Sequence, residues 1–295
     1  MKTYKIIANP SSGREQGLQV VQDLVALFSK DEVRLDILFT QKEGDGTRFA
    51  RQEGEEDLLI AIGGDGTVNE VVNGLYERTR PLPLAIFPCG TVNDLGQYLD
   101  LPSDSGEFYQ MIKKQKTLKA DLGKAADRIF INVAAGGLFS EVAYSVPDKN
   151  KSLLGRKAYY LEGARSFLTN RKEMEGFPLD ITSPEGHFST EAVLFIVANT
   201  RRVGGFENLV PEAEIHDGQL DVLIIKEIDM GNILELLRDL GRGKHVENQH
   251  VIYFKTPWVQ LESSQDLALD LDGEYAGKLP VKIEIIPEAI DLVVK

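Results

Sequence analysis

The sequence is poor in the residues that characterise secreted and membrane-spanning proteins. It holds a single cysteine, Cys89, among 295 residues, which excludes a disulfide within the chain. No apolar run approaches the roughly 20 residues that a membrane-spanning helix needs. Met1 and Lys2 are followed directly by a strand-like segment, which leaves no room for the apolar region of a secretory signal. These absences predict a cytoplasmic protein, with transient membrane contact left open.

Positive charge is also scarce. The chain carries 33 Lys and Arg against 46 Asp and Glu, which gives a formal net charge of −13. An unpatterned surface of this kind repels nucleic acid and anionic lipid headgroups, and the sequence has no basic stripe. We therefore expect no nucleic-acid partner. The hydrophobic fraction of 42% allows sizeable cores, and the composition leaves open whether the chain forms a homodimer.

Several common catalytic motifs are missing. The chain has no Gly-x-x-x-x-Gly-Lys-Ser/Thr loop, no His-Glu-x-x-His and no Cys-x-x-Cys. A Gly-x-Gly-x-x-Gly turn comes closest at Gly64-Asp65-Gly66, but Asn69 stands where the last glycine belongs. Because no base lies nearby in sequence, Cys89 is interpreted as a small buried residue rather than a nucleophile. The histidines show no convincing ligand spacing and are predicted to lie on the surface: His187, His216, His245 and His250.

Residues 58–75 are the most informative segment that is present. The continuous apolar run from Leu58 to Ile62 predicts a parallel strand buried on both faces. Apolar residues at helical spacing then predict a helix, namely Val68, Val71, Val72 and Leu75. The turn between them contains three glycines around one carboxylate, Asp65. Such a turn presents backbone N–H groups to a phosphate, and the carboxylate suits a magnesium ion beside it.

Ordinary helix capping is the alternative interpretation of this turn. Thr67 and Glu70 form a Thr-x-x-Glu capping box that would serve any helix. Against that alternative, a turn that only connects two elements needs neither an acidic residue nor three glycines in four positions. The pattern favours phosphate binding, with a nucleotide as the ligand.

Similar strand-to-helix turns occur twice more in the first part of the chain. Tyr4–Ala8 is followed by the turn 9–14, and Leu84–Phe87 by the turn 88–94. A helix is predicted after the first turn from Leu18, Val21, Val25 and Phe28, and a further strand from Val33 to Phe39. Parallel α/β sheets bind ligands at the carboxyl ends of their strands, so three such turns predict one site. Residues 1 to about 120 are expected to form an α/β domain with a parallel sheet.

The second half of the chain changes to strands without intervening helices. The predicted strands are Ile129–Ala134, Leu179–Thr182, Ala192–Ala198, Leu220–Ile225, Val251–Phe254, Leu267–Leu271 and Val281–Ile286. Several alternate apolar and polar residues, as half-solvated antiparallel strands do. Two helices are expected, at 155–169 and at 230–240, the second with an apolar stripe of Ile233, Leu236, Leu237 and Leu240. A β-rich second domain follows, and a cleft between two domains is a common place for a substrate.

The residues from Gly63 to Glu70 and from Pro88 to Asp94 together resemble the diacylglycerol kinase catalytic domain family, which includes sphingosine kinases and bacterial lipid kinases. The resemblance runs the whole length, in family order, through Asn9-Pro10 with Gly13, residues 134–137, Gly155 with 158–160, Asp217-Gly218 and Asp272-Gly273-Glu274. The soluble Gram-positive diacylglycerol kinases match best. The resemblance implies an ATP-binding α/β domain of NAD kinase and diacylglycerol kinase type over residues 1–122 and 288–295. It also implies a β-sandwich domain for the lipid substrate over residues 123–287.

The resemblance also implies roles for individual residues in the first domain. Asp65 would orient a magnesium ion near the γ-phosphate, and Asp94 would join the same network of magnesium and water. Without the resemblance, a Thr91-x-x-Asp94 helix cap explains Asp94 equally well. The implied ATP contacts are Asn9, Pro10, Ser11, Ser12, Gly13, Thr40, Gly64, Asp65, Gly66, Thr67, Val68, Asn69, Glu70 and Thr91.

Two acidic turns carry the implied roles in the second domain. Asp272-Gly273 is a strong hairpin signal, and on spacing alone Glu274 would only end that turn. The resemblance implies instead that Glu274 is the base that accepts the proton of the lipid hydroxyl. Asp217-Gly218 also predicts a hairpin turn, but in related bacterial enzymes this loop binds a structural magnesium. There Asp217 would supply its side chain, with Glu214 and Gln219 as further ligands.

The implied function is a magnesium-dependent kinase that transfers the ATP γ-phosphate to a lipid hydroxyl, taking diacylglycerol from a membrane surface and producing phosphatidic acid. Two departures concern charge: Gln97 stands where many relatives have Arg, and Glu162 where a close type has Lys. They are the only hints of a rival, a nucleotide-binding regulator without catalysis. An NAD kinase is the other rival because it shares the Gly-Gly-Asp-Gly turn, although Asn93-Asp94 favours the lipid family.

Overall fold

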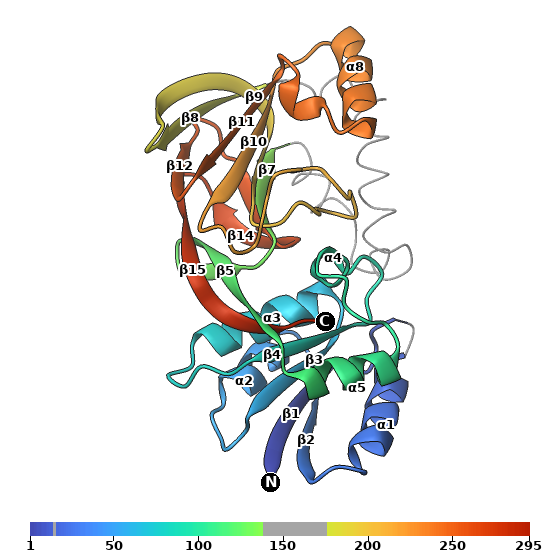
Figure 1. Ribbon diagram of the computed structural model, residues 1–295. Helices are drawn as coiled ribbons and strands as arrows, with labels where there is room; N and C mark the ends of the chain where they lie inside the picture. The colour runs from blue at the N-terminus through green and yellow to red at the C-terminus, as the bar shows by residue number, and fades with distance from the viewer. Residues whose placement is uncertain (14–15, 138–175) are drawn as a thin grey trace. The chain divides into compact units, whose positions relative to one another are not determined.

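The computed structural model describes residues 1–13, 16–137 and 176–295 (Figure 1). The chain divides into two compact units, residues 1–121 with 288–295 and residues 122–287. This division lies one residue before the boundary expected from the sequence. Strands β5 (Thr117–Ala125) and β15 (Val281–Val293) contain the two points where the chain passes from one unit to the other. The helix predicted at 155–169 lies outside the described residues.

The first unit contains the predicted parallel sheet. Its strands are ordered β2 (Val33–Phe39), β1 (Lys2–Ala8), β3 (Leu58–Gly63) and β4 (Leu84–Pro88). The end of β15 joins this sheet beside β4, where Leu292 pairs with Leu84 in parallel. Every residue of β3 is buried. The sheet is covered on both faces, and for that reason the β3 sequence is continuously apolar instead of alternating.

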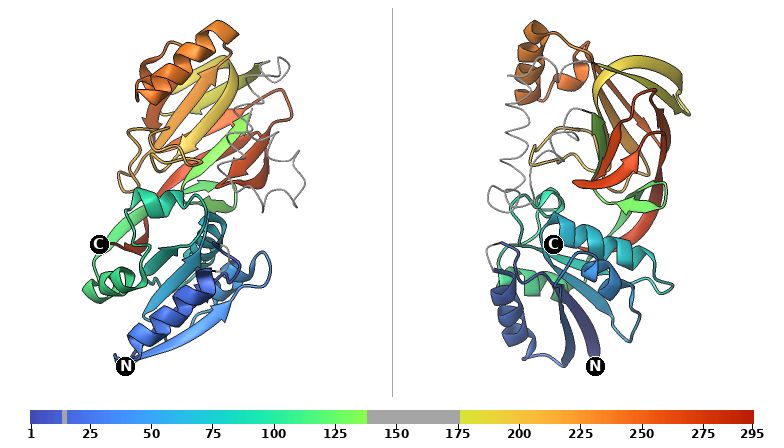
Figure 2. Two further views of the ribbon diagram at one scale, coloured as in Figure 1. Left: turned by 90° about the vertical axis from the view of Figure 1, so that its right-hand side faces the viewer. Right: turned by 180° about the vertical axis from the view of Figure 1, so that it is seen from behind.

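Helices cover both faces of this sheet. The chain moves from β1 to β2 in one direction along the sheet and from β3 to β4 in the other. Right-handed crossovers therefore place α1 (Gln16–Phe28) and α3 (Asp65–Tyr76) on opposite faces. Helix α1 packs against α5 (Ser105–Lys114), and α2 (Asp45–Arg51) packs against α3 (Figure 2).

The predicted apolar face is right for α3 and partly wrong for α1. All four predicted residues of α3 are buried. In α1, Val21 and Phe28 are buried as predicted, but Leu18 and Val25 are exposed, and Val20 and Leu24 point into the core instead. The α1 sequence carries two overlapping apolar stripes, and packing against the sheet selects the one on the side of Leu24.

The second unit is an antiparallel β-sandwich, as predicted. Strand β9 (Gly186–Ala198) is central to it: residues 186–192 pair with β8 (Phe177–Ser183), and residues 192–198 pair with β7 (Val133–Gly137) and β10 (Leu220–Lys226). Strand β11 (Val251–Thr256) extends the sheet beyond β10. The unit also contains β12 (Trp258–Glu262), β13 (Ala268–Leu271) and β14 (Glu274–Lys278).

Residues 192–198 of β9 and 220–224 of β10 are buried on both faces, so these two segments do not show the half-solvated alternation expected for several strands of this half. Phe195 and Val222 belong to the core between the sheets. Leu194 and Leu223 face a second apolar cluster that includes Ile233 of helix α8 (Met230–Gly241). Of the stripe predicted for α8, Ile233 and Leu236 are buried, whereas Leu237 is exposed.

A long-range contact divides the strand predicted at Ile129–Ala134. The chain forms β6 (Arg128–Phe130) and β7, with a break between them. At the break, the carboxylate of Asp272 accepts hydrogen bonds from the backbone N–H groups of Ile131, Asn132 and Val133 at 2.9, 3.0 and 2.8 Å. These amides are satisfied by a side chain instead of a neighbouring strand, so the strand cannot continue through them.

The two predicted hairpins have different outcomes. Asp272 and Gly273 connect β13 to β14 with φ values of 50° and 89°, the left-handed pair that a two-residue hairpin turn needs. Asp217-Gly218 connects no pair of strands, so this hairpin prediction is wrong. There the Asp217 carboxylate accepts the N–H of Gln219 at 3.0 Å in the loop that leads into β10.

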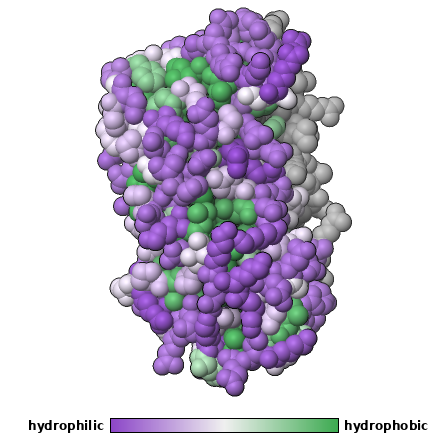
Figure 3. Space-filling model, in the orientation of Figure 1, coloured by the Kyte–Doolittle hydropathy of each residue, from purple (hydrophilic) through white to green (hydrophobic). Residues whose placement is uncertain are grey.

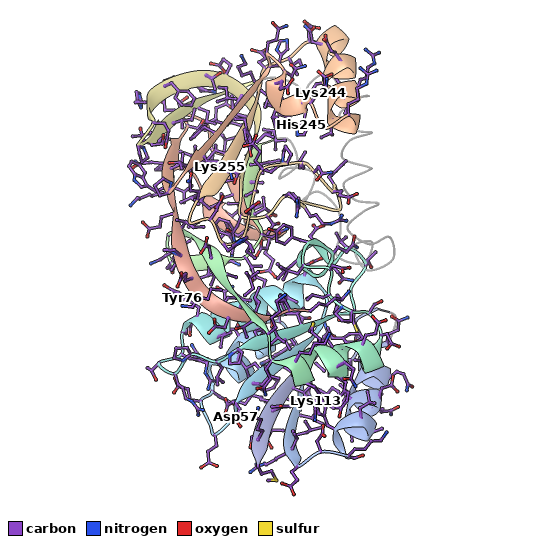
Figure 4. The ribbon with its side chains drawn as sticks, viewed as in Figure 1. Asp57, Tyr76, Lys113, Lys244, His245 and Lys255 are labelled. Carbon is purple, nitrogen blue, oxygen red and sulfur yellow. The ribbon has the colours of Figure 1, made fainter. Side chains whose placement is uncertain are left out.

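One histidine contradicts the prediction of four surface histidines. His245 begins a short 3-10 helix (His245–Glu247) next to α8 and is buried, with Nε2 bonded to the carbonyl of Leu209 at 2.7 Å (Figure 4). The face of the molecule shown in Figure 3 is largely hydrophilic, as the high charge content requires. Within the described residues, no helix is long and apolar enough to cross a membrane.

Candidate active site

The predicted turns of the first unit meet at the ends of its parallel strands. Strands β1 and β3 are neighbours whose following connections leave in opposite directions, and parallel sheets bind ligands at such a point. The hydrogen-bond ladder continues past the strand ends. The N–H of Asn9 donates to Ile62, that of Thr40 to Ala8 and that of Cys89 to Gly63, at 2.9, 2.9 and 2.8 Å. The starts of three turns and Thr40 therefore lie side by side.

Glycines allow these turns to approach one another closely. A Cβ atom at Gly13, where φ is +59°, would lie 2.3 Å from the carbonyl oxygen of Cys89. A Cβ atom at Gly90 would lie 2.6 Å from the Cα of Gly64. Both distances are shorter than any real contact, so only glycine fits at these positions. The first turn touches the third, and the third touches the second, without side chains between them.

Asp65 links the second turn to the third. Its two carboxylate oxygens accept the N–H groups of Asn93 at 3.0 Å and Asp94 at 2.9 Å, at the start of α4 (Asp94–Tyr98). Asn93 has φ +51° and bonds back to Gly90 through both its Oδ1 and its Nδ2, each at 2.7 Å. The structure thus brings the two predicted magnesium residues, Asp65 and Asp94, into direct contact.

Neither capping alternative describes these helices. The N-cap of α3 is Gly64, which has no side chain to cap the helix. Glu70 instead accepts the N–H groups of Gly44 and Gly46 at 2.9 and 2.8 Å, at the start of α2. The N-cap of α4 is Asn93, again with no side-chain cap bond, so the Thr91 and Asp94 pair does not form either. The start of α3 keeps the partial positive charge that favours a phosphate.

The other predicted ATP residues are placed unequally. Ser11 donates its N–H to Asn9 Oδ1 at 3.0 Å, and Ser12 donates to the Asn9 carbonyl at 3.2 Å, which shapes the first turn. Pro10, Ser12, Gly13, Thr40 and Gly66 are partly accessible, and Ser11 and Thr91 are exposed. Thr67 is buried and lies 3.4 Å from the side-chain nitrogen of Asn9.

Two of those residues face the protein interior. Val68 and Asn69 are buried within α3. The N–H of Val68 already donates to Gly64 at 3.0 Å, and the side chain of Asn73 bonds to Asn69 at 3.0 and 3.1 Å. In the first helical turn, the backbone N–H groups that point toward the helix start are therefore those of Asp65, Gly66 and Thr67.

Magnesium fits the pair of Asp65 and Asp94. This ion typically binds to one or two carboxylates and takes its remaining ligands from phosphates and waters. The oxygens of Asp65 accept the N–H groups of Asn93 and Asp94, which aims the carboxylate at the start of α4. Asp94 is 6% exposed and lies at the helix start that these bonds fix. Both residues were predicted, but their contact through the α4 backbone was not.

Glu274 begins β14 at the hairpin tip, and its partner was not anticipated. Its Oε2 lies 3.1 Å from the guanidinium of Arg128, which also donates to the carbonyl of Tyr275 at 2.6 Å. About a third of each charged side chain is accessible, 33% for Glu274 and 38% for Arg128. No sequence pattern marked Arg128, because the pair joins residues 146 positions apart. The guanidinium therefore orients a carboxylate that is partly accessible to solvent.

The loop predicted to bind structural magnesium already contains a cation. The ammonium of Lys255 lies 2.8 Å from Asp217 Oδ2 and donates to the carbonyl of Glu212 at 2.7 Å (Figure 4). The carbonyl of Glu214 accepts the N–H of Asp217 at 3.4 Å, and the N–H of Gln219 donates to Asp217 Oδ1. Because the Lys255 ammonium is already bound to the Asp217 carboxylate, these residues do not fit a magnesium ion. Over the described part of the chain, no group of three or more His, Cys, Asp or Glu residues is arranged to hold a metal.

Two further sequence features have clear places. Cys89 is buried, and burial raises the pKa of its thiol to about 11, so the thiolate nucleophile does not form near neutral pH. The side-chain nitrogen of Gln97 donates to the carbonyl of Val92 at 2.7 Å and stabilises the third turn. Glu162 lies outside the described residues.

Similar proteins are found for the whole chain. A family model described as the diacylglycerol kinase catalytic domain matches residues 3–125, and one described as the YegS C-terminal NAD kinase beta sandwich-like domain matches residues 133–294. A diacylglycerol kinase from Staphylococcus epidermidis is 38% identical over 99% of this chain and 92% of its own length. One from Staphylococcus aureus is 37% identical over the same shares. The crystal structure of a diacylglycerol kinase from Bacillus anthracis matches with a TM-score of 0.81 and 28% identity, over 100% of this chain and 97% of that chain.

Proposed function

The chain belongs to the diacylglycerol kinase catalytic domain family and is a lipid kinase, and from this premise we propose that it transfers the γ-phosphate of ATP to the hydroxyl group of diacylglycerol. The observation that carries the proposal is the meeting of three glycine turns at the strand ends of the first unit, with Asp65 bonded to the start of α4. Phosphoryl transfer depends mainly on positioning and charge neutralisation, which rigid turns of this kind supply.

ATP would bind with its phosphates at the start of α3. The backbone of Asp65, Gly66 and Thr67 faces this helix start, and no N-cap side chain competes there with a phosphate. Asp65 and Asp94 would hold the magnesium ion, which when bound neutralises the phosphate charge. The amides of Asn93 and Asp94 fix the direction of the Asp65 carboxylate before any ligand arrives.

Glu274 would act as the general base. The acceptor hydroxyl gives its proton to the Glu274 carboxylate while its oxygen bonds to the γ-phosphorus. The bond from that phosphorus to the β–γ bridging oxygen breaks, and ADP leaves. Arg128 holds the carboxylate from one side and fixes its direction, since the guanidinium is also bound to the Tyr275 carbonyl. Partial exposure of the pair leaves room for a hydroxyl within hydrogen-bonding distance.

The acceptor would be taken from a membrane surface by a cytoplasmic protein that associates only transiently. The relatives from Staphylococcus are named diacylglycerol kinases, and diacylglycerol resides in membranes. With a net charge of −13, the protein as a whole is repelled by anionic lipid. Association would therefore rely on a local contact and on the acceptor itself. Co-sedimentation with vesicles that contain diacylglycerol tests this, and no association at any lipid composition or salt concentration would contradict it.

An NAD kinase activity is the second candidate. The sandwich of the second unit matches a family described as NAD kinase beta sandwich-like, which supports a dinucleotide acceptor as the rival. The backbone geometry at the start of α3 serves an ATP donor equally in both candidates. The acceptor alone distinguishes them.

An acceptor panel with [γ-³²P]ATP and magnesium separates the candidates. Diacylglycerol, monoacylglycerol and sphingosine in mixed micelles are compared with NAD and with no acceptor. The proposal predicts labelled phosphatidic acid as the main product. Labelled NADP with no labelled lipid would support the second candidate. ATP binding without transfer to any acceptor would indicate a regulator that has lost catalysis.

A further inference from the structure

A cluster of oxygen atoms surrounds the ammonium group of Lys255 in the second unit, apart from the residues assigned to catalysis. Lys255 on β11 is the direct cross-strand partner of Asp221 on β10. Its Nζ lies 2.7 Å from the Glu212 carbonyl, 2.8 Å from Asp217 Oδ2 and 3.8 Å from Asp221 Oδ2. Two carboxylates and one carbonyl therefore converge on one positive charge.

Asp221 shows that this cluster needs a cation. Its side chain is fully buried, at 0% exposure, and its Oδ2 has no hydrogen-bond partner. The hydroxyl of Tyr253, two residues before Lys255, donates to the other oxygen of the carboxylate. Burying a carboxylate without a compensating charge is strongly unfavourable. Within the described ranges, Lys255 supplies the positive charge beside Asp221.

The arrangement resembles the coordination of a metal ion. Divalent cations in proteins collect carboxylate and backbone carbonyl oxygens, often from a single loop. Here the loop supplies the Glu212 carbonyl and the Asp217 carboxylate, and β10 supplies Asp221. An ammonium group has three N–H donors on one nitrogen atom, so it can bond to several such oxygens at once. Lys255 is tethered to β11, so its position is set by the pairing of β10 with β11.

We propose that Lys255 is a built-in cation that replaces a structural magnesium ion in this chain. It ties the 212–221 loop to β11 without any metal, and the fold of the second unit is therefore independent of divalent cations. The proposal does not rest on the proposed kinase reaction. It concerns how Lys255 holds the 212–221 loop in place, and it is tested by measuring the stability of the protein.

The substitution Lys255→Met removes the charge and keeps most of the aliphatic length. It leaves Asp217, Asp221 and the Glu212 carbonyl facing one another without a cation, an arrangement that is unfavourable unless a metal enters. In EDTA and without nucleotide, we expect the Tm of Lys255→Met to fall by roughly 5 °C or more below wild type. Millimolar magnesium should restore much of this loss.

Lys278→Met is the matched control. Lys278 pairs with Asp266 in the same unit, but both side chains are largely exposed, at 47% and 73%. Exposed pairs contribute roughly 0–1 kcal/mol, so this variant should keep the wild-type Tm and the wild-type response to magnesium. A Tm of Lys255→Met equal to that of wild type in EDTA would overturn the proposal. So would a magnesium response of Lys255→Met no larger than that of the control.

Manganese provides a second measurement, which uses the wild-type protein and does not depend on the variant folding. Paramagnetic Mn²⁺ broadens the amide signals of residues close to a bound ion. Without nucleotide, signals of residues 214–219 should be broadened no more than those of other exposed loops. Selective broadening of these residues in the wild-type protein would place a divalent ion beside Asp217 and overturn the proposal. The same signals in folded Lys255→Met should broaden.

Discussion

The two units of the molecule hold their predicted site carboxylates in different ways. In the first unit, backbone N–H groups hold Asp65 and Glu70, two for each carboxylate. In the second unit, side-chain cations hold Glu274 and Asp217, through Arg128 and Lys255. The first kind of partner is neutral and fixed by the main chain. The second is charged and sits at the end of a long side chain.

This difference determines what each carboxylate can do. Backbone amides orient Asp65 without adding a full positive charge, which is compatible with the proposed magnesium ion. A guanidinium or ammonium neutralises its partner and excludes a metal. The pair of Glu274 and Arg128 is partly exposed, so under the proposed mechanism a substrate hydroxyl can approach the carboxylate while Arg128 stays bound to it. Lys255 also lies beside Asp221, which is fully buried, so removing the ammonium from Asp217 would leave a buried carboxylate without that charge.

Among the variants that test this comparison, Glu274→Gln should have the largest effect. Glu274→Gln removes the basic oxygen and the ion pair but keeps the shape of the side chain. Turnover should fall by about 10²–10⁴-fold, the usual contribution of a general base, while ATP affinity and Tm stay near wild type. Glu284→Gln is the control, because Glu284 pairs with Lys282 on the exposed part of β15 in a similar way. A Glu274→Gln enzyme with near-normal turnover would rule out the role of base.

Asp65→Asn tests the carboxylate that is held by amides. An asparagine has one acceptor oxygen for the N–H groups of Asn93 and Asp94, so one of these donors loses its partner. The free energy of unfolding should fall by about 1–3 kcal/mol in urea titrations. The magnesium concentration for half-maximal activity should also rise, since the charge is lost. Asp57→Asn serves as the control, because Asp57 is exposed and its carboxylate accepts the N–H of Thr3 at 2.9 Å, far from the start of α4 in sequence. An unchanged magnesium titration in Asp65→Asn would contradict the assignment.

Gly13→Ala tests whether the turns must touch. The new Cβ would lie 2.3 Å from the Cys89 carbonyl, so the first and third turns must separate. We expect ATP affinity to fall about tenfold or more, because a separation of that size removes roughly one phosphate contact worth about 1.4 kcal/mol. Gly243→Ala controls for backbone strain alone: its φ of +69° is similar, and its Cβ would meet nothing within 4 Å. Equal ATP affinities for both variants and wild type would show that the contact between the turns does not matter for the nucleotide.

Asp45 combines both kinds of partner and should show the smallest effect. Its pKa is lowered to about 2, first by the Arg48 guanidinium and then by the backbone N–H of Gln41. A lowered pKa stabilises the fold above the ordinary carboxyl pKa near 4, and this contribution is lost as the pH falls toward 2. Asp45→Asn should therefore be less stable than wild type at pH 7, and the difference should shrink between pH 4 and pH 2. A constant difference across that range, in urea unfolding at each pH, would contradict the assigned cause.

Local patterns predicted the first unit well because its site is built from short segments. The apolar run before Gly63 and the spacing from Val68 to Leu75 specify a strand and a helix without help from the rest of the chain. The glycines of the turns indicated close approach, and the structure shows which backbones approach. The bonds from Asp65 to Asn93 and Asp94 join residues 28 and 29 positions apart, and no local rule specifies them.

The second unit was harder to predict because distant residues decide its details. Asp272 interrupts a strand 140 positions earlier by binding Asn132, and nothing near Asn132 indicates this. Lys255 reaches Asp217 across 38 positions through the pairing of β10 with β11. His245 looked like a surface residue in a polar stretch, but the carbonyl of Leu209 gives it a buried partner. Each of these contacts joins segments far apart in sequence, and the apolar pattern alone does not specify them.

The central claim is that the glycine turns of the first unit bind the phosphates of ATP. A crystal structure with magnesium and a non-hydrolysable ATP analogue tests it directly. The account predicts phosphate oxygens within hydrogen-bonding distance of the backbone N–H groups of Gly66 and Thr67, and a magnesium ion bound by Asp65 or by its waters. A nucleotide bound away from the turns at Asn9, Gly64 and Gly90 would contradict it.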